Sequence, residues 1–172
     1  MLTRCYIGGV KSLLIVYQSV TGGTRQMAEA AARVARDEAG VSVQLLTAPE
    51  ARPAHVLAAD AFIFATPENL GSMAGLMKDF FDRSYYAALD RLNGRAYATL
   101  VCAGSDGQGA ARQLERIATG WRLKSACAPL IVCTHAQTPA AIEAPKTIGP
   151  ADIQRCEEIG ALLAAGLAAG IY

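Results

Sequence analysis

Five short runs of apolar residues, rich in branched side chains, recur along the chain. They cover residues 12–17, 41–46, 61–65, 96–102 and 130–133. Apolar residues follow one another in these runs instead of alternating with polar ones. This pattern is typical of parallel strands that are covered by helices on both faces.

The segments between the runs carry apolar residues at a helical spacing. Met27, Ala31, Val34 and Ala35 form one such stripe, and residues 76–84, 114–121 and 153–167 carry the others. Residues 49–58 give a weaker signal for an element between the second and third strands. Gly40 is a plausible helix stop, and Asn93-Gly94 predicts a turn. The order is therefore βαβαβαβαβα, which predicts an α/β fold with a doubly wound parallel sheet.

Length and composition narrow the classes of protein. A chain of 172 residues with 52% apolar residues predicts a single domain, 1–172, with residues 1–11 as a short leader. A net charge of +1 without a basic cluster argues against nucleic acid as a partner, and no apolar run is long enough for a membrane span.

The five cysteines and two histidines argue against a metal site. No two cysteines have a CxxC spacing, and neither His55 nor His135 has the spacing of a zinc ligand. An odd number of cysteines, three of them in apolar runs, indicates free thiols in a reducing compartment, so we expect a cytoplasmic protein.

The first strand is followed by small and hydroxyl-bearing residues before a helix begins. A loop at this place lies at the carboxyl edge of the sheet, where folds of this kind bind ligands, and the helix N-terminus offers free N–H groups. Glycines allow close backbone approach, and hydroxyls add donors. The loop therefore predicts a phosphate cradle, although a plain capped turn remains an alternative, and Arg25 can pair with the phosphate or face solvent. The cradle residues are Ser19, Val20, Thr21, Gly22, Gly23 and Thr24.

This S-x-T-G-x-T pattern resembles the FMN phosphate loop of the flavodoxin superfamily. The stretch ATPENLGSMAGLMKDFFDR, residues 65–83, is similar to the segment after strand three in NAD(P)H-dependent FMN and quinone reductases, including the tryptophan-repressor-binding-protein type. The resemblance implies that this loop lines the isoalloxazine ring. A loop ending in a helix capped by Ser72 is the structural alternative. The implied flavin-lining residues are Thr66, Pro67, Glu68, Asn69, Leu70, Gly71 and Ser72.

A third glycine-rich loop, CAGSDGQGA, follows the fourth strand. By the same resemblance, its N–H groups meet the pyrimidine edge of the flavin. Asp106 can accept a hydrogen bond from the cofactor or cap the next helix, and both remain open. The residues concerned are Ala103, Gly104, Ser105, Asp106, Gly107 and Gly109.

The resemblance implies a flavodoxin-like sheet of five parallel strands in the order 2-1-3-4-5, one bound FMN, and NAD(P)H as the electron donor. Hydride would pass to the flavin, and electrons would then pass to a quinone or another small acceptor. The cofactor does the chemistry, so no catalytic side chain is expected. The family also suggests a homodimer or homotetramer.

Two other functions remain open. A flavodoxin-type electron carrier would use the same cofactor without NAD(P)H activity, but such carriers are strongly acidic and this chain is not. The other open function is that of a flavin-free domain that uses the fold for interaction or regulation.

The irregular residues 134–150, with three prolines, are expected to be functional or to form an interface.

Overall fold

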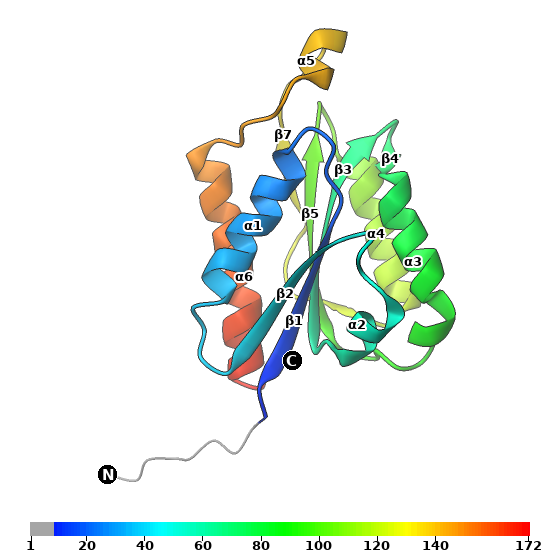
Figure 1. Cartoon of the computed structure of the whole chain (residues 1–172), viewed down its shortest axis with the longest axis vertical. Helices are drawn as coiled ribbons and strands as arrows, with labels where there is room; N and C mark the ends of the chain where they lie inside the picture. Colours follow the sequence, from blue (N-terminus) through cyan, green and yellow to red (C-terminus); the bar gives the residue numbers. More distant parts are fainter. Residues whose placement is uncertain (1–8) are drawn as a thin grey trace.

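The computed structural model describes residues 9–172, and most of the predicted leader lies outside this range. Two layers of helices enclose a central sheet (Figure 1). The strands are β1 (Lys11–Tyr17), β2 (Val41–Thr47), β3 (Ala61–Asn69), β4 (Ser72–Met73), β5 (Ala96–Ala103), β6 (Lys124–Ser125) and β7 (Leu130–Cys133). The helices are α1 (Gly23–Ala35), α2 (Pro53–Ala58), α3 (Gly75–Ala88), α4 (Gln108–Gly120), α5 (Pro139–Glu143) and α6 (Pro150–Ala168).

The strand order confirms the predicted doubly wound sheet. The order is β2-β1-β3-β5, and the far side of β5 pairs in parallel with β6 at its start and with β7 at its end. The predicted fifth strand is confirmed as β7, and β6 is an additional short strand beside the start of β5. The sheet is also not wholly parallel, because β4 pairs antiparallel with the end of β3. The sheet has seven strands instead of the expected five.

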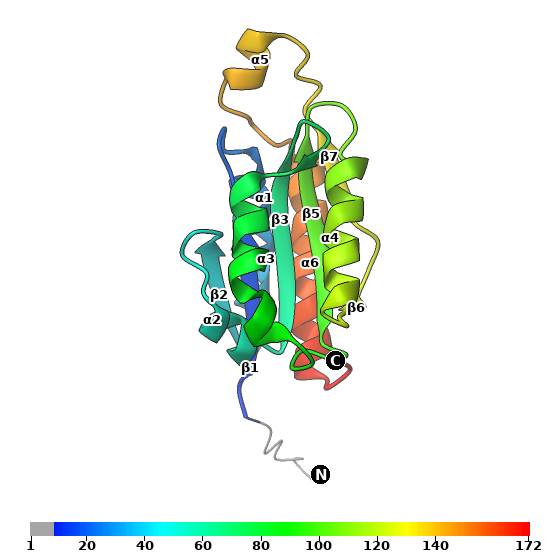
Figure 2. The same ribbon diagram turned by 90° about the vertical axis from the view of Figure 1, so that its right-hand side faces the viewer.

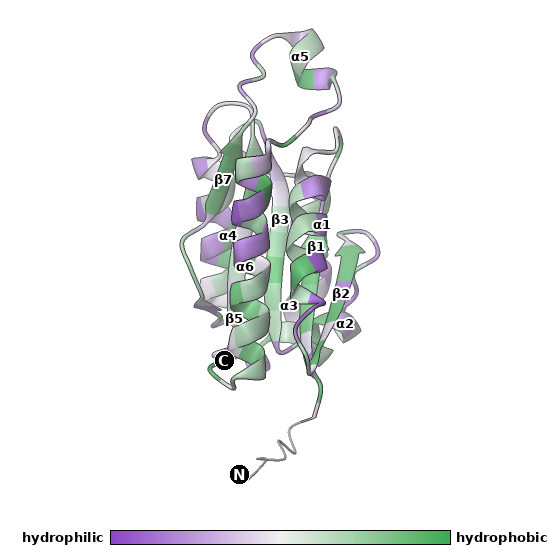
Figure 3. Cartoon of the chain, turned by 90° about the vertical axis from the view of Figure 1, so that its left-hand side faces the viewer, coloured by the Kyte–Doolittle hydropathy of each residue, from purple (hydrophilic) through white to green (hydrophobic). Residues whose placement is uncertain are grey.

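The helices lie on both faces of the sheet, as expected. α1 and α6 cover one face, and α2, α3 and α4 cover the other (Figures 1 and 2). Each face has its own apolar core, one around Phe64 and Trp121 and one around Ile15 and Leu163. The strands between the two layers are hydrophobic, as β3 and β7 show in Figure 3. Trp121 belongs to the first core, where its ring contacts those of Phe80 and Phe81.

Three details differ from the predictions. α1 ends at Ala35, so Gly40 is not its stop; instead Gly40 has φ 82° in the turn before β2, where its carbonyl accepts from the N–H of Lys11. Leu76, expected in the core, is 48% exposed at the start of α3. The expected irregular segment contains one short helix, α5, which lies beyond the carboxyl ends of the strands (Figure 1).

The small residues near the C-terminus allow α6 to pack closely on α1. A methyl group added at Gly160 would lie 2.1 Å from the carbonyl oxygen of Ala31. The glycine- and alanine-rich sequence of α6 therefore serves helix packing within the chain. Among residues 9–172, no helix is both long and apolar enough to cross a lipid bilayer.

We expect Gly160→Ala to lower the free energy of unfolding by about 1–3 kcal/mol, because the added methyl overpacks the contact between α1 and α6. Chemical denaturation monitored by circular dichroism measures the change. Gly120→Ala is the matched control, since a methyl there meets nothing within 4 Å. Equal stability of both variants would contradict the close contact.

Candidate cofactor site

The candidate site lies at the carboxyl edge of the sheet, where the loops after β1, β3 and β5 converge (Figure 1). Residues 134–149, which connect β7 to α6 and include α5, form a fourth wall; we call this segment the strap. Together they surround a main cavity of about 790 Å³. Cavities of roughly 300–1,000 Å³ suit small molecules and cofactors.

The loop after β1 presents a row of hydrogen-bond donors that no protein group uses. The N–H of Gln18 still continues the sheet, donating to the carbonyl of Ala65 at 3.0 Å, and the N–H of Gln26 closes the first helical turn. Between them, the N–H groups of residues 19–25 donate to no group among the residues that the structure describes. These donors precede and begin α1, where the helix dipole favours an anion.

Two further features of this loop fit a phosphate. The Ser19 hydroxyl is buried without a hydrogen-bond partner, which is costly unless a ligand supplies one. Gly22 precedes α1 and has φ 89°, a conformation that glycine adopts readily. No side chain caps this helix. The residues therefore fit the phosphate monoester of FMN, and the donors are neutral, as the sequence predicts.

Gly23 is required by packing below the loop. A methyl group at this position would lie 2.6 Å from Sγ of Cys102 and 3.3 Å from Cβ of Lys146. Cys102, at the end of β5, also lines the main cavity. Burial raises the pKa of the Cys102 thiol, although the nearby Lys146 ammonium opposes the shift. The thiol is therefore protonated at neutral pH and packs as an apolar group.

The second predicted loop is a β-hairpin. β3 runs on to Asn69, the chain turns at Leu70 and Gly71, and β4 returns antiparallel. Leu70 and Gly71 have φ of 51° and 71°, as a two-residue hairpin turn requires. Positive φ is unusual for leucine, and the Leu70 side chain is fully exposed beside the cavity.

Glu68 does not project freely toward a ligand. Its carboxylate accepts hydrogen bonds from the N–H groups of Gly107 at 2.7 Å, Gly109 at 3.0 Å and Ala110 at 3.3 Å. Glu68 thus caps α4 from a distant part of the chain and fixes the hairpin to the third loop. The N–H groups of Gly107 and Gly109 are already used, so they are not free for a flavin edge as the resemblance implies.

The structure supports neither of the two roles considered for Asp106. Its side chain is exposed and lines neither cavity, and no side chain of the third loop itself caps α4. Gly109 allows the third loop to approach the hairpin closely, since a methyl group there would lie 2.0 Å from the carbonyl oxygen of Gly71. Gly107 and Gly109 of the third loop therefore support the hairpin, whereas Ala103, Gly104 and Ser105 line the main cavity.

Thr66 and Ser72 hold the base of the hairpin. The Thr66 hydroxyl is buried and accepts from the N–H of Ala74 at 3.1 Å, and Ser72 donates to Gln113 at 2.8 Å. The residue that precedes α3 is Ala74, so Ser72 is not the cap of that helix.

The structure brings most of the predicted residues to the main cavity. These are Ser19, Val20, Thr21, Gly23, Thr24, Pro67, Glu68, Asn69, Leu70, Gly71, Ala103, Gly104 and Ser105. Gly22 lines a neighbouring side cavity, whereas Thr66, Ser72, Asp106, Gly107 and Gly109 line neither. The sequence prediction missed Cys102, Thr134, Ala136, Gln137, Ile142, Glu143 and Lys146. All but Cys102 belong to the strap, whose only signal in the sequence is its length and its prolines.

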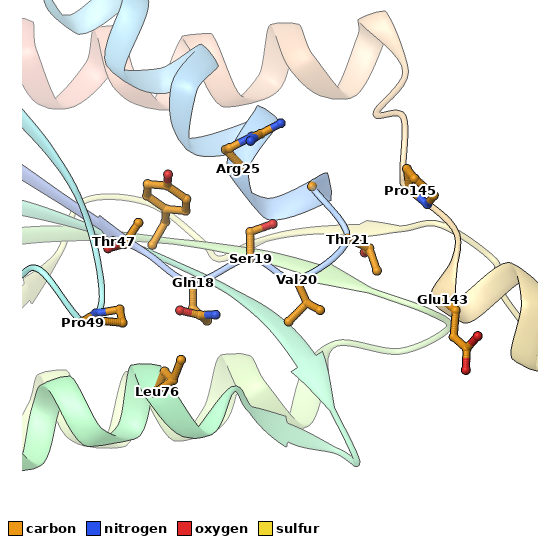
Figure 4. Close-up of a pocket in the computed structure, with 12 residues that line it drawn as sticks. Gln18, Ser19, Val20, Thr21, Arg25, Thr47, Pro49, Leu76, Glu143 and Pro145 are labelled. Carbon is orange, nitrogen blue, oxygen red and sulfur yellow. The ribbon is translucent and has the colours of Figure 1, made fainter.

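The side cavity, of about 590 Å³, lies across the same loop (Figure 4). Gln18, Val20 and Leu76 line it, and Glu143 and Pro145 of the strap close the end beside Thr21. Arg25 lines it too, but its side chain is 58% exposed and its nearest acidic partner is Glu29 at 3.7 Å. Arg25 is therefore a solvent-facing helix residue that a phosphate can still attract. His135 is exposed and lines neither cavity.

A doubly wound sheet with its ligand-sized cavity at the carboxyl edge, and a donor-lined loop after the first strand, defines a flavodoxin-like protein. Residues 48–136 match the model of the family described as NADPH-dependent FMN reductase. The chain belongs to the NADPH-dependent FMN reductase family. The matched residues include the hairpin and the third loop but not the loop after β1.

Curated relatives match parts of this chain. An NAD(P)H dehydrogenase (quinone) of Acidithiobacillus ferrooxidans is 36% identical over 42% of this chain and 46% of its own length. A flavodoxin of Aquifex aeolicus is 36% identical over 56% of this chain and 50% of its own. The chain thus spans about half the length of the curated relatives it matches.

The fold also matches a flavodoxin, WrbA-like protein from Agrobacterium tumefaciens. The TM-score is 0.71 at 19% identity, and the match covers 92% of this chain and 98% of that one. At this identity, the likeness shows the fold alone.

Proposed function

We propose that this protein binds FMN and acts as an NAD(P)H-dependent reductase that passes electrons to a quinone or another small acceptor. The observation that carries the proposal is the row of unused N–H donors in residues 19–25, with the unpartnered Ser19 hydroxyl, at the edge of a ligand-sized cavity. Membership of the NADPH-dependent FMN reductase family and a quinone dehydrogenase relative support it.

FMN, when bound, supplies the hydride and electron transfer. The protein's part is to bind and orient it: Ser19, Thr21 and the N–H groups around Gly22 would hold the phosphate. The hairpin around Leu70, together with Ala103, Gly104 and Ser105, would flank the ring. No aromatic side chain lines the main cavity within residues 9–172. Neither face of the flavin ring would therefore be covered by an aromatic side chain of this cavity, where a flat donor or acceptor would stack.

The proposal is tested by loading the protein with FMN and mixing it anaerobically with NADH and, separately, NADPH. We expect the oxidised flavin band at about 450 nm to bleach with at least one nucleotide and to return when a quinone is added. A mixture without nucleotide is the control. Persistent colour with both nucleotides, despite bound FMN, would contradict reductase activity.

A flavodoxin-type electron carrier is the second candidate, and the Aquifex aeolicus relative favours it. Carriers of this kind dock on basic partner proteins through acidic surfaces. Here the cavity is bordered by the exposed apolar side chains of Val20, Leu70 and Ile142. An apolar border suits a small flat acceptor better than a basic protein, so we place the reductase first.

We further propose a cytoplasmic homodimer or homotetramer. The four cysteines that the structure describes are free, in keeping with a reducing compartment.

The proposed assembly is supported by exposed apolar surface at the end of α3, formed by Tyr85, Tyr86 and Leu89, which a second copy can cover. Light scattering after size-exclusion chromatography measures the mass of the assembly.

A further inference from the structure

The strap is joined to the phosphate-binding loop by one side chain of α1, that of Gln26. Its Nε2 atom donates to the carbonyl of Lys146 at 2.6 Å and to that of Gly22 at 3.0 Å. Its Oε1 atom accepts from the N–H of Ile148 at 3.1 Å. The amide thus bonds to the strap as both donor and acceptor, across 120 residues of sequence to Lys146.

Lys146 extends this connection in two directions. Its N–H donates to the carbonyl of Thr21 at 2.8 Å, and its ammonium donates to the carbonyls of Ala141 at 2.7 Å and Ile142 at 2.8 Å in α5. These carbonyls lie at the end of α5, where helices leave acceptors unpaired. α5 has no buried residue, so its position depends on such bonds and not on a core.

The same bonds fix the orientation of donors in the loop. A peptide unit is planar, so the carbonyl of Thr21 and the N–H of Gly22 turn together, as do the carbonyl of Gly22 and the N–H of Gly23. Lys146 holds the first unit and Gln26 holds the second. Both N–H groups belong to the row that would bind the phosphate.

We propose that Gln26 is a positioning residue that couples occupation of the phosphate-binding loop to the placement of the strap. Through Lys146 it also sets the place of Ile142 and Glu143, which line the wall of the main cavity. The proposal rests on the proposed binding of FMN. Because coupling is reciprocal, FMN should stabilise the strap, and a loosened strap should weaken FMN.

The test compares Gln26→Met, which keeps the length but removes both polar atoms, with Gln154→Met on the exposed face of α6. Fluorescence titrations give the dissociation constants for FMN and for riboflavin, which lacks the phosphate. We expect Gln26→Met to weaken FMN about tenfold, equivalent to roughly one or two hydrogen bonds, and riboflavin much less. Gln154→Met should bind both ligands as the unchanged protein does.

Hydrogen exchange read by mass spectrometry supplies the second readout. In the flavin-free protein, Gln26→Met should speed exchange in residues 139–148, and in the unchanged protein FMN, but not riboflavin, should slow it. Unchanged FMN affinity and unchanged exchange would overturn the proposal. So would equal weakening of FMN and riboflavin, which indicates general loss of structure.

The two proposals fail in different ways. If the unchanged protein binds no FMN, the proposed function fails, while the exchange comparison of flavin-free proteins still judges the connection between Gln26 and the strap. If Gln26→Met does not fold, the comparison of FMN with riboflavin in the unchanged protein decides. Equal protection of residues 139–148 by the two ligands would then overturn the coupling.

Discussion

Thr21→Glu should abolish the preference of the protein for FMN over riboflavin. Thr21 lines both cavities at the centre of the donor row, so a carboxylate there would face the phosphate. Two unit charges about 4 Å apart repel by about 4 kcal/mol at an effective dielectric of about 20, and solvent at this open site reduces that value. We expect a loss of FMN affinity of about 100-fold, measured by fluorescence titration.

Thr21→Gln is the matched control, because it adds similar bulk without charge. It should weaken FMN only a few-fold, and riboflavin affinity should change little in either variant. If Thr21→Glu keeps the affinity of the unchanged protein for FMN, the phosphate does not bind in this loop. If Thr21→Gln loses as much as Thr21→Glu, bulk and not charge is responsible.

The sequence predicts five of the seven strands, because each of these lies in a segment rich in apolar residues; it does not predict β4 and β6, which have two residues each. Leu130–Cys133 begins and ends where the pattern places it, and the other runs differ by a few residues at one end or the other. The largest difference is in β3, which continues through Thr66 to Asn69. A proline and a glutamate in this stretch suggest a loop, but Thr66 and Pro67 pair with β5, and Glu68 and Asn69 pair with β4, so the stretch stays extended.

The donor-lined loop was predictable because its chemistry is local. Hydroxyls and glycines between a strand and a helix bring their donors to the helix N-terminus, and the distant bonds of Lys146 and Gln26 then fix how the peptide units are turned. The role of Glu68 was not predictable in this way. Its partners, Gly107 and Gly109, are 39 and 41 residues away, and no spacing rule links a carboxylate to a helix N-terminus at that distance.

The position of the strap was not predictable from the sequence either. Its cavity-lining residues, such as Ile142 and Lys146, follow no helical or strand period, and their place is set by bonds to Gln26 and Thr21. Gln26 itself looks like an ordinary polar residue of an amphipathic helix. Long-range hydrogen bonds of single side chains leave no pattern in one sequence, although here they help to place strap residues that line the main cavity.

Glu68 unites two of the three loops, which makes it the most consequential carboxylate of the site. It binds the first N–H groups of α4, where a negative charge is favoured by the helix dipole, and it holds the hairpin that carries Leu70. Removing it leaves partly buried donors without a partner. Such a loss costs about 1–3 kcal/mol, more than the typical surface substitution.

We therefore expect Glu68→Ala to lower the melting temperature by about 4–8 °C, as follows from about 2 kcal/mol in a chain of this size. Hydrogen exchange should rise in residues 67–73 and 107–110 together, because one carboxylate holds both. Glu68→Gln keeps one acceptor oxygen and should lose less. Glu115→Ala, on the exposed face of α4, controls for removal of a charge. Faster exchange in the hairpin alone would show that another group caps α4, and Glu68 would then not join the two loops.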